Sequence, residues 1–274
     1  MLKNFKNIII TGGAGMVGSY FDFGQKLDKG NFDITDGDAC LRFFKDKKPD
    51  LVIHLAALTD MAYCEENPEE AYKVNSLGTY NIARSARSVG AKMVYLSSGT
   101  VFGKEGKSEY GEKDLPGSLN VYGRTKLAGE YMVSDIDKNN LVIRTGWLFG
   151  GGEKNDKKFV SKIIIRIKEG KKIKAISDRF GSPAYIKDVV LKISELIEQN
   201  ASGTYHAVNS GKASYYDFAL VIAKYFDYDK ISPCPASDFK EIAPRPESEV
   251  LVSEKIILRP WQDALNEYLE TEWK

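Results

Sequence analysis

The sequence is poor in cysteine and in net charge. Its three cysteines, Cys40, Cys64 and Cys234, are spread over 274 residues, a spacing that fits neither a disulfide framework nor a metal site. We therefore expect reduced thiols, no metal centre and a cytoplasmic protein. The formal net charge is +1. Without an overall basic field, nucleic acid is not an expected partner.

Long apolar runs are also missing. The apolar stretches are far shorter than the roughly 20 residues that span a bilayer, so a membrane is not expected as a partner either. The chain enters a strand pattern within a few residues of Met1, which leaves no room for a signal peptide. Neither repeats nor low-complexity tracts occur. A chain of 274 residues has room for one large domain or two.

A glycine-rich turn follows the first apolar run. Asn7–Thr11 is typical of a buried strand, and Gly12, Gly15 and Gly18 follow it in the pattern G-x-x-G-x-x-G. In a dinucleotide fold these glycines permit a tight turn, let backbone approach a pyrophosphate, and let a helix pack on the strand. The amides at the start of that helix would face the phosphates. Glycine-rich turns also occur in ordinary loops, but this position predicts a dinucleotide site.

The crossover after this turn is expected to be short. Only 14 residues lie between Gly18 and Asp33, and Gly24 interrupts them. The second strand should therefore be reduced or displaced. Residues 33–36 carry a helix N-cap signature, and Asp33 is expected near the adenine of the cofactor. Two nearby lysines leave the choice between NAD and NADP open, with NADPH slightly favoured.

Three further apolar runs predict parallel strands whose carboxyl ends face one crevice. They cover residues 50–57, 92–98 and 141–145. The first ends in small residues, which suit close contact between backbone and cofactor. The second ends on Ser97 and Ser98, whose hydroxyls would face the ligand crevice. His54 and His206, the only histidines, are expected to be structural groups.

A tyrosine and a lysine stand four residues apart at the predicted start of a helix, at Tyr122 and Lys126. This spacing places both side chains on one helical face. The ammonium should lower the pKa of the phenol from about 10 toward neutrality and hold a ribose hydroxyl of the cofactor. Such a phenol exchanges a proton with an alkoxide or an alcohol. Because the pair also arises by chance, its weight comes from the surrounding motifs.

Strict alternation of strands and helices is lost in the second half of the chain. A loop, a helix, a strand and a further helix are predicted at 150–157, 158–169, 173–176 and 188–199. We predict an α/β fold, a Rossmann doubly wound parallel sheet with a smaller C-terminal substrate-binding lobe. Residues 1–147 would bind the dinucleotide, segments near 186–208 would return to that domain, and 148–274 would form mainly the smaller lobe.

Four motifs resemble the extended short-chain dehydrogenase/reductases and, among them, the dTDP-4-dehydrorhamnose reductases. The motifs are Thr11–Gly18, Tyr122–Glu130, Arg144–Trp147 and Phe180–Pro183. The likeness covers nearly the whole chain. It implies hydride transfer from NAD(P)H to the keto group of a nucleotide-diphospho-4-keto-6-deoxy sugar. It leaves the oligomeric state open, a homodimer included.

The resemblance also implies roles for individual residues. Tyr122 would protonate the developing alkoxide, Lys126 would lower the pKa of Tyr122 and hold the nicotinamide ribose, and Ser98 would hydrogen-bond the substrate oxygen. Other residues would contact the pyrophosphate (Gly12, Gly15, Met16, Val17), the adenine (Asp33, Ile34), the rest of the cofactor (Leu55, Ala56, Ala57, Thr59) and the sugar (Thr100, Trp147). From the residues alone, Trp147 lines the substrate pocket or caps a core.

The substrate-facing positions depart from the family pattern. Gly99 and Thr100 stand where the reductases commonly have Asp-Tyr, residues 61–63 lack an aspartate of the family, and Arg179 stands where glutamine is usual. Two alternatives therefore stay open. One is a sugar-nucleotide 4-epimerase, which uses the same three catalytic residues and retains NAD. The other is a non-catalytic NADP-binding regulatory subunit, similar to the regulatory β subunit of methionine adenosyltransferase.

Overall fold

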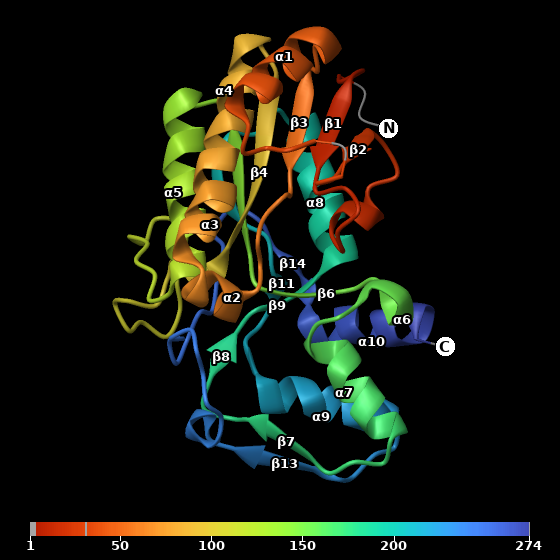
Figure 1. The fold of residues 1–274 in the computed structure, drawn as a ribbon. Helices are drawn as coiled ribbons and strands as arrows, with labels where there is room; N and C mark the ends of the chain where they lie inside the picture. Colours follow the sequence, from red (N-terminus) through yellow and green to blue (C-terminus); the bar gives the residue numbers. More distant parts are fainter. Residues whose placement is uncertain (1–3, 31, 274) are drawn as a thin grey trace.

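A six-stranded parallel sheet forms the centre of the molecule, and a smaller lobe of helices and short strands lies at one end of it (Figure 1). The structure is a computed structural model, which describes residues 4–30 and 32–273. The spatial order of the strands is β10-β5-β4-β3-β1-β2, and all neighbours are parallel. The strands are β1 (Ile8–Thr11), β2 (Gln25–Leu27), β3 (Leu51–His54), β4 (Lys92–Ser98), β5 (Leu141–Thr145) and β10 (Gly203–His206). The predicted α/β class and the parallel sheet are confirmed.

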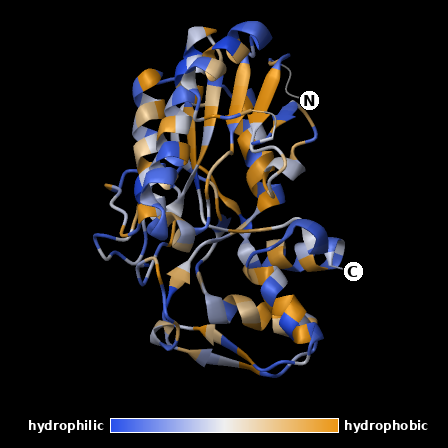
Figure 2. Cartoon of the chain, viewed as in Figure 1, coloured by the Kyte–Doolittle hydropathy of each residue, from blue (hydrophilic) through white to orange (hydrophobic). Residues whose placement is uncertain are grey.

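Helices cover both faces of this sheet. One face is covered by α1 (Gly37–Lys47), α4 (Thr79–Ser88) and α5 (Val121–Ile136), and the other by α8 (Ile186–Glu198) (Figure 1). Because neither face meets water, the inner strands β1, β3, β4 and β5 are largely apolar and buried along their length rather than alternating (Figure 2). Because the helices cover the two faces, the carboxyl ends of the strands stay open at one end of the sheet.

The first crossover is short, as predicted, but it contains no α-helix. The glycine-rich turn leads into a three-residue 3-10 helix, η1 (Gly18–Tyr20), and the chain then turns at Gly24, where φ is +81°, to enter β2. The expectation that a helix follows the glycines is therefore wrong, because the segment is too short to hold one and still reach β2. The helix N-cap predicted at 33–36 is Asp36, whose side chain accepts a hydrogen bond from the Ala39 amide at 2.9 Å.

The helical segment between β3 and β4 is interrupted by a π-helical turn. The elements are α2 (Met61–Glu66), α3 (Pro68–Tyr72), the π-helix η2 (Lys73–Gly78) and α4. Asn75 lies buried in the π-helical turn. Its amide accepts from the Leu58 N–H at 2.8 Å and donates to the Leu58 carbonyl at 3.0 Å. The irregular turn, a feature often found at functional sites, thus fixes the loop that leaves β3.

The smaller lobe has its own core. Phe218 and Tyr268 lie at its centre, packed among α7 (Phe159–Lys168), α9 (Tyr215–Tyr225) and α10 (Trp261–Glu272). The remaining short elements are β6 (Trp147–Phe149), α6 (Gly152–Asn155), β7 (Ile173–Ile176), β8 (Phe180–Gly181), β9 (Pro183–Tyr185), β11 (Asn209–Ser210), β12 (Ala213–Ser214), β13 (Ile231–Cys234), η4 (Ala236–Asp238) and β14 (Leu258–Pro260). The predicted helix near 158–169 and strand at 173–176 are confirmed, whereas the predicted loop 150–157 contains α6. That one part of the chain binds the cofactor and the other mainly the substrate stays a prediction.

Cys40, Cys64 and Cys234 are all buried and unpaired. No helix in the described ranges is both long and apolar enough to span a bilayer.

A buried ion pair joins helix α5 to the sheet. Arg144 on β5 donates from Nη2 to Glu130 Oε2 at 2.7 Å and from Nε to Glu130 Oε1 at 2.9 Å. The side chains are only 6% and 5% exposed. We expect Arg144→Met to lower the free energy of unfolding by about 3–5 kcal/mol, because the Glu130 carboxylate would stay buried without its counter-charge.

Urea unfolding monitored by circular dichroism measures this loss. A double variant, Arg144→Met with Glu130→Leu, removes both charges and should recover much of the stability. If the single and double variants were equally destabilised, the cost would come from packing rather than from the unpaired charge.

Candidate active site

One cavity of about 1530 Å³ runs from this end of the sheet to the smaller lobe. The carboxyl ends of β1, β3, β4 and β5 open into it, which is where parallel α/β sheets bind ligands. Every residue predicted for the site from the sequence lines this cavity: Gly12, Gly15, Met16, Val17, Asp33, Ile34, Leu55, Ala56, Ala57, Thr59, Ser98, Thr100, Tyr122, Lys126 and Trp147. The fold thus brings together residues that are up to 135 positions apart in the chain (Gly12 to Trp147).

The glycine-rich turn fits the diphosphate of a dinucleotide. Gly12 has a φ of +69°, and a Cβ there would lie 2.7 Å from the Ala56 amide nitrogen. Only glycine therefore allows the turn after β1 to press against the end of β3. Within the described ranges the amides of Met16 and Val17 form no hydrogen bond. They are free to donate to phosphate oxygens in the cavity.

A residue that sequence reasoning missed lies where the adenosine ribose of a dinucleotide is expected. Asp28 directly follows β2 and lines the cavity. A carboxylate at the end of the second strand is the group that contacts the adenosine ribose in dinucleotide folds. The prediction named Asp33, near the adenine, and not Asp28, because β2, with three residues, is too short to be recognised. Asp33 also lines the cavity. Both carboxylates accept from an amide two residues further on, Asp28 from Gly30 and Asp33 from Thr35, each at 2.9 Å.

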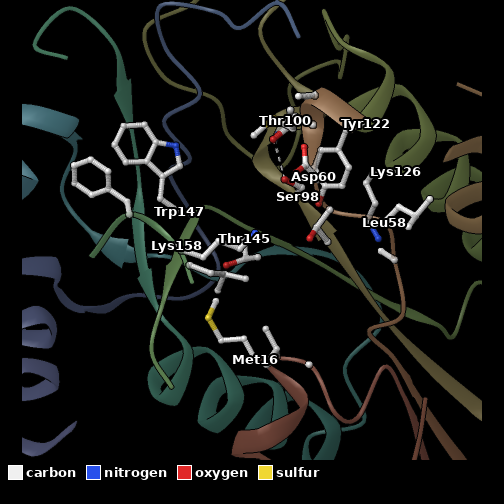
Figure 3. A pocket seen from close by; sticks show the side chains of 18 of the residues that line it. Met16, Leu58, Asp60, Ser98, Thr100, Tyr122, Lys126, Thr145, Trp147 and Lys158 are labelled. Atoms are coloured by element: carbon white, nitrogen blue, oxygen red, sulfur yellow. Dashed lines mark hydrogen bonds between the residues drawn. The ribbon is translucent and has the colours of Figure 1, made fainter. Parts of the chain in front are cut away.

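Ser98, Tyr122 and Lys126 meet on one side of the cavity (Figure 3). Helix α5 begins at Val121 because the Asn120 side chain caps it, accepting from the Gly123 amide at 2.9 Å. The first turn of α5 carries Tyr122 and the next carries Lys126. Ser98, the last residue of β4, lies close enough to Tyr122 to lower the pKa of its phenol. The three residues predicted to be catalytic are therefore neighbours.

Burial sets the protonation of this group. It raises the pKa of Tyr122 to about 12, against the opposing effect of the nearby Ser98 hydroxyl. It also lowers the pKa of Lys126 to about 7, and the Lys126 ammonium lies 4.1 Å from the centre of the Tyr95 ring. The prediction that Lys126 brings the pKa of Tyr122 toward neutrality is wrong for this structure. The largest cause of the raised pKa is burial, which removes the phenolate from water.

Trp147 faces the catalytic group from the far side of the cavity (Figure 3). Its indole stacks on the Tyr215 ring, with centroids 4.0 Å apart and an interplanar angle of 10°. Its Nε1 donates to Glu249 Oε1 at 2.6 Å. The pocket-lining alternative for Trp147 is thus the one observed. Tyr215 and Glu249 both line the cavity, and sequence reasoning missed both because no motif marks their segments.

The two histidines lie outside the cavity lining. The ring of His54 is hydrogen-bonded on both sides: Nδ1 lies 2.6 Å from Thr11 Oγ1, and Nε2 lies 3.1 Å from Thr79 Oγ1. Burial lowers the pKa of His54 to about 3, so the ring is neutral. His206 Nδ1 lies 2.9 Å from the Val252 carbonyl oxygen. These contacts support structural roles for both rings.

Comparisons with known proteins agree with the site. Residues 6–273 match the family described as the RmlD substrate binding domain. A dTDP-4-dehydrorhamnose reductase of Mycolicibacterium smegmatis is 34% identical, over 96% of this chain and 84% of the relative. The crystal structure of dTDP-4-dehydrorhamnose reductase from Yersinia enterocolitica has a TM-score of 0.93 at 38% identity, covering 97% of this chain and 99% of the other.

A third relative has been solved with a cofactor. The dTDP-4-dehydrorhamnose reductase of Bacillus anthracis, in complex with NADP, has a TM-score of 0.91 at 30% identity and covers 97% of this chain and 99% of its own. Its cofactor agrees with the free amides and glycines of the turn after β1. The chain therefore belongs to the family of the RmlD substrate binding domain, within the extended short-chain dehydrogenase/reductases that include the dTDP-4-dehydrorhamnose reductases.

Proposed function

We propose that this protein is an NAD(P)H-dependent reductase of dTDP-4-dehydrorhamnose, a nucleotide-linked 4-keto-6-deoxy sugar. The observation that carries the proposal is the grouping of Ser98, Tyr122 and Lys126 in the cavity that also contains the glycine-rich turn. The relatives named dTDP-4-dehydrorhamnose reductase support the choice of substrate.

The side chains supply a proton and an orientation to the keto group. NAD(P)H bound in the cavity supplies the hydride for the keto carbon. Tyr122 holds its proton at neutral pH, because burial raises its pKa to about 12, and donates it to the carbonyl oxygen as negative charge develops there. Ser98 hydrogen-bonds the same oxygen, and Lys126 holds a ribose hydroxyl of the cofactor. The products are the alcohol and NAD(P)+.

We also propose that the two parts of the chain divide the ligands between them. Residues 1–147, with the segments near 186–208, would bind the cofactor, since α8 and β10 pack into the core of the sheet. Residues 148–274 would mainly bind the sugar nucleotide. Lys158, Lys162 and Arg166 line the cavity from the smaller lobe, and cations suit a diphosphate.

Oxidation of NADPH and NADH by the purified protein, followed at 340 nm with dTDP-4-dehydrorhamnose, tests the proposed function. We expect turnover and formation of the dTDP-linked alcohol. Saturable coenzyme binding without turnover would favour a regulatory subunit instead. Nicotinamide that stays bound through purification, together with interconversion of two sugar nucleotides, would favour the epimerase.

Asp28 is expected to control the choice of coenzyme. Its carboxylate suits the 2′-hydroxyl of NADH and repels the 2′-phosphate of NADPH, whereas Lys29 and Lys73, which line the same part of the cavity, favour the phosphate. We expect Asp28→Asn to shift the ratio of kcat/KM for NADPH over NADH upward by about 10-fold. Lys29→Ala should shift the same ratio downward. Shifts in the same direction for both variants would contradict this assignment.

A further inference from the structure

Glu249 is a buried carboxylate in the lining of the cavity. Its residue is 9% exposed, and no ion pair of the described ranges includes it. Arg179 and Arg245, the arginines near Tyr215, both pair with Glu241 instead. Burying a carboxylate without a counter-charge is unfavourable. Stability alone therefore does not account for Glu249.

The carboxylate is placed between the residues expected to face the substrate. Oε1 accepts from Trp147 Nε1 at 2.6 Å, and Oε2 accepts from Thr100 Oγ1 at 3.3 Å. Thr100 Oγ1 in turn lies 3.0 Å from Ser98 Oγ (Figure 3). Glu249 is thus two hydrogen bonds away from the hydroxyl that contacts the reacting oxygen. A carboxylate has about four acceptor positions, and Trp147 and Thr100 occupy two.

Because position 99 is a glycine, the segment that carries Glu249 can pack directly beside it. A Cβ at Gly99 would lie 3.3 Å from Leu251 Cδ1 and 3.5 Å from the Glu249 carbonyl oxygen. A larger acidic side chain, which the resemblance to the reductases implies for this position, would crowd the segment 249–251. Here that segment packs against the bare glycine and carries a carboxylate into the cavity itself.

We propose that Glu249 is a specificity-determining residue that accepts a hydrogen bond from the sugar hydroxyl on the carbon next to the keto carbon. The proposal rests on the proposed function, because it places the keto group at Tyr122 and Ser98. With the keto group there, the proposal places the hydroxyl of the adjacent carbon beside Thr100 and Trp147, the two residues that already donate to Glu249. A site built to bind a hydroxyl discriminates strongly against an analogue that lacks it.

The first test compares Glu249→Ala with the wild type on two substrates, dTDP-4-dehydrorhamnose and its 3-deoxy analogue. We expect kcat/KM to fall about 10–100-fold on the full substrate and less than about 3-fold on the analogue, because the lost contact is absent there already. Equal losses on both substrates would overturn the proposal, since Glu249 would then act only by holding Trp147 or Thr100.

A second test needs no turnover, so it separates this proposal from the proposed function. The affinities of dTDP-L-rhamnose and of dTDP are measured by calorimetry on the NADP-loaded protein. Glu249→Ala should weaken dTDP-L-rhamnose about 10-fold and leave dTDP unchanged; equal effects on both ligands would overturn the assignment. Glu247→Gln, which removes a charge two residues away on an exposed side chain outside the cavity, should change neither. Absence of turnover in the wild type would count against the reductase function alone.

Discussion

Replacing Tyr122 with phenylalanine is expected to lower the turnover of dTDP-4-dehydrorhamnose by about 10²–10⁴-fold, the range typical for loss of a general acid. The substitution removes one oxygen from the cavity and leaves the ring that packs there. The affinity for NADPH should change little, because the glycine-rich turn and Lys126 still contact the cofactor. Single-turnover oxidation of NADPH measures the chemical step, and fluorescence titration measures cofactor binding.

The matched control lies on the same helix. Tyr131 is 58% exposed, so Tyr131→Phe makes the same chemical change on α5 away from the cavity and should leave turnover unchanged. If Tyr122→Phe kept its rate, the proton would have to come from another group, and Ser98 would be the first to test. A large loss of NADPH affinity in the variant would instead show that the phenol serves mainly to bind the cofactor.

The pKa of Tyr122 shows how burial can override a local pattern. Spacing along the helix correctly predicts that Tyr122 and Lys126 share a face, and this spacing alone predicts a phenol that ionises easily. Burial raises the pKa of the phenol to about 12 and lowers that of the lysine to about 7. For reduction of a ketone this is the useful direction, because the acid must carry its proton at neutral pH. The extent of burial is a tertiary property that four-residue spacing does not contain.

Much of the sheet could be predicted from the sequence. The bounds of β4 and β5 coincide with the apolar runs at 92–98 and 141–145, because strands covered on both faces must be apolar throughout. The glycine-rich turn can be recognised because the positive φ of Gly12 and its close contact with Ala56 require glycine. Each of these signals is local, and each reflects a constraint that acts on neighbouring residues.

The parts that escaped prediction depend on contacts between distant segments. β2 has three residues, of which two are exposed, so it carries no apolar run, and Asp28 was missed with it. Glu249 lies in a stretch without periodicity or motif, and its place beside Thr100 comes from a hydrogen bond across 149 positions. The departure at Gly99 could be read from the sequence, but the segment that fills the space beside it could not.

Replacing Lys126 with methionine is expected to make the cofactor-free protein more stable while removing most of its activity. The residue is only 3% exposed, and no hydrogen bond of its Nζ occurs in the described part of the chain. Methionine has a similar length and carries no charge to desolvate, so we expect the free energy of unfolding at pH 7 to rise by about 1–3 kcal/mol. Turnover should fall about 10²–10⁴-fold, since the ribose contact is lost.

The pH dependence of stability separates this explanation from a simple gain in packing. The pKa of Lys126 is about 7 in the folded protein and near its ordinary 10.5 in the unfolded chain. Between these values the unfolded chain binds more protons, so the contribution of Lys126 to stability rises with pH. Of the groups around it, Glu130 raises the lysine pKa, and His54 stays neutral in this range. The stability gained by Lys126→Met should thus be largest at pH 7 and below, and should disappear near pH 10.5.

Thermal unfolding of both proteins from pH 6 to 10 measures this difference, with Lys138→Met as the control on an exposed lysine just beyond α5. A gain that is constant across this range would come from packing. A loss of stability at every pH would mean that contact with the Tyr95 ring outweighs the desolvation of the ammonium. The expected result is a variant that is more stable and nearly inactive. It would show that the charge of Lys126 lowers the stability of the cofactor-free protein and serves cofactor binding and the reaction.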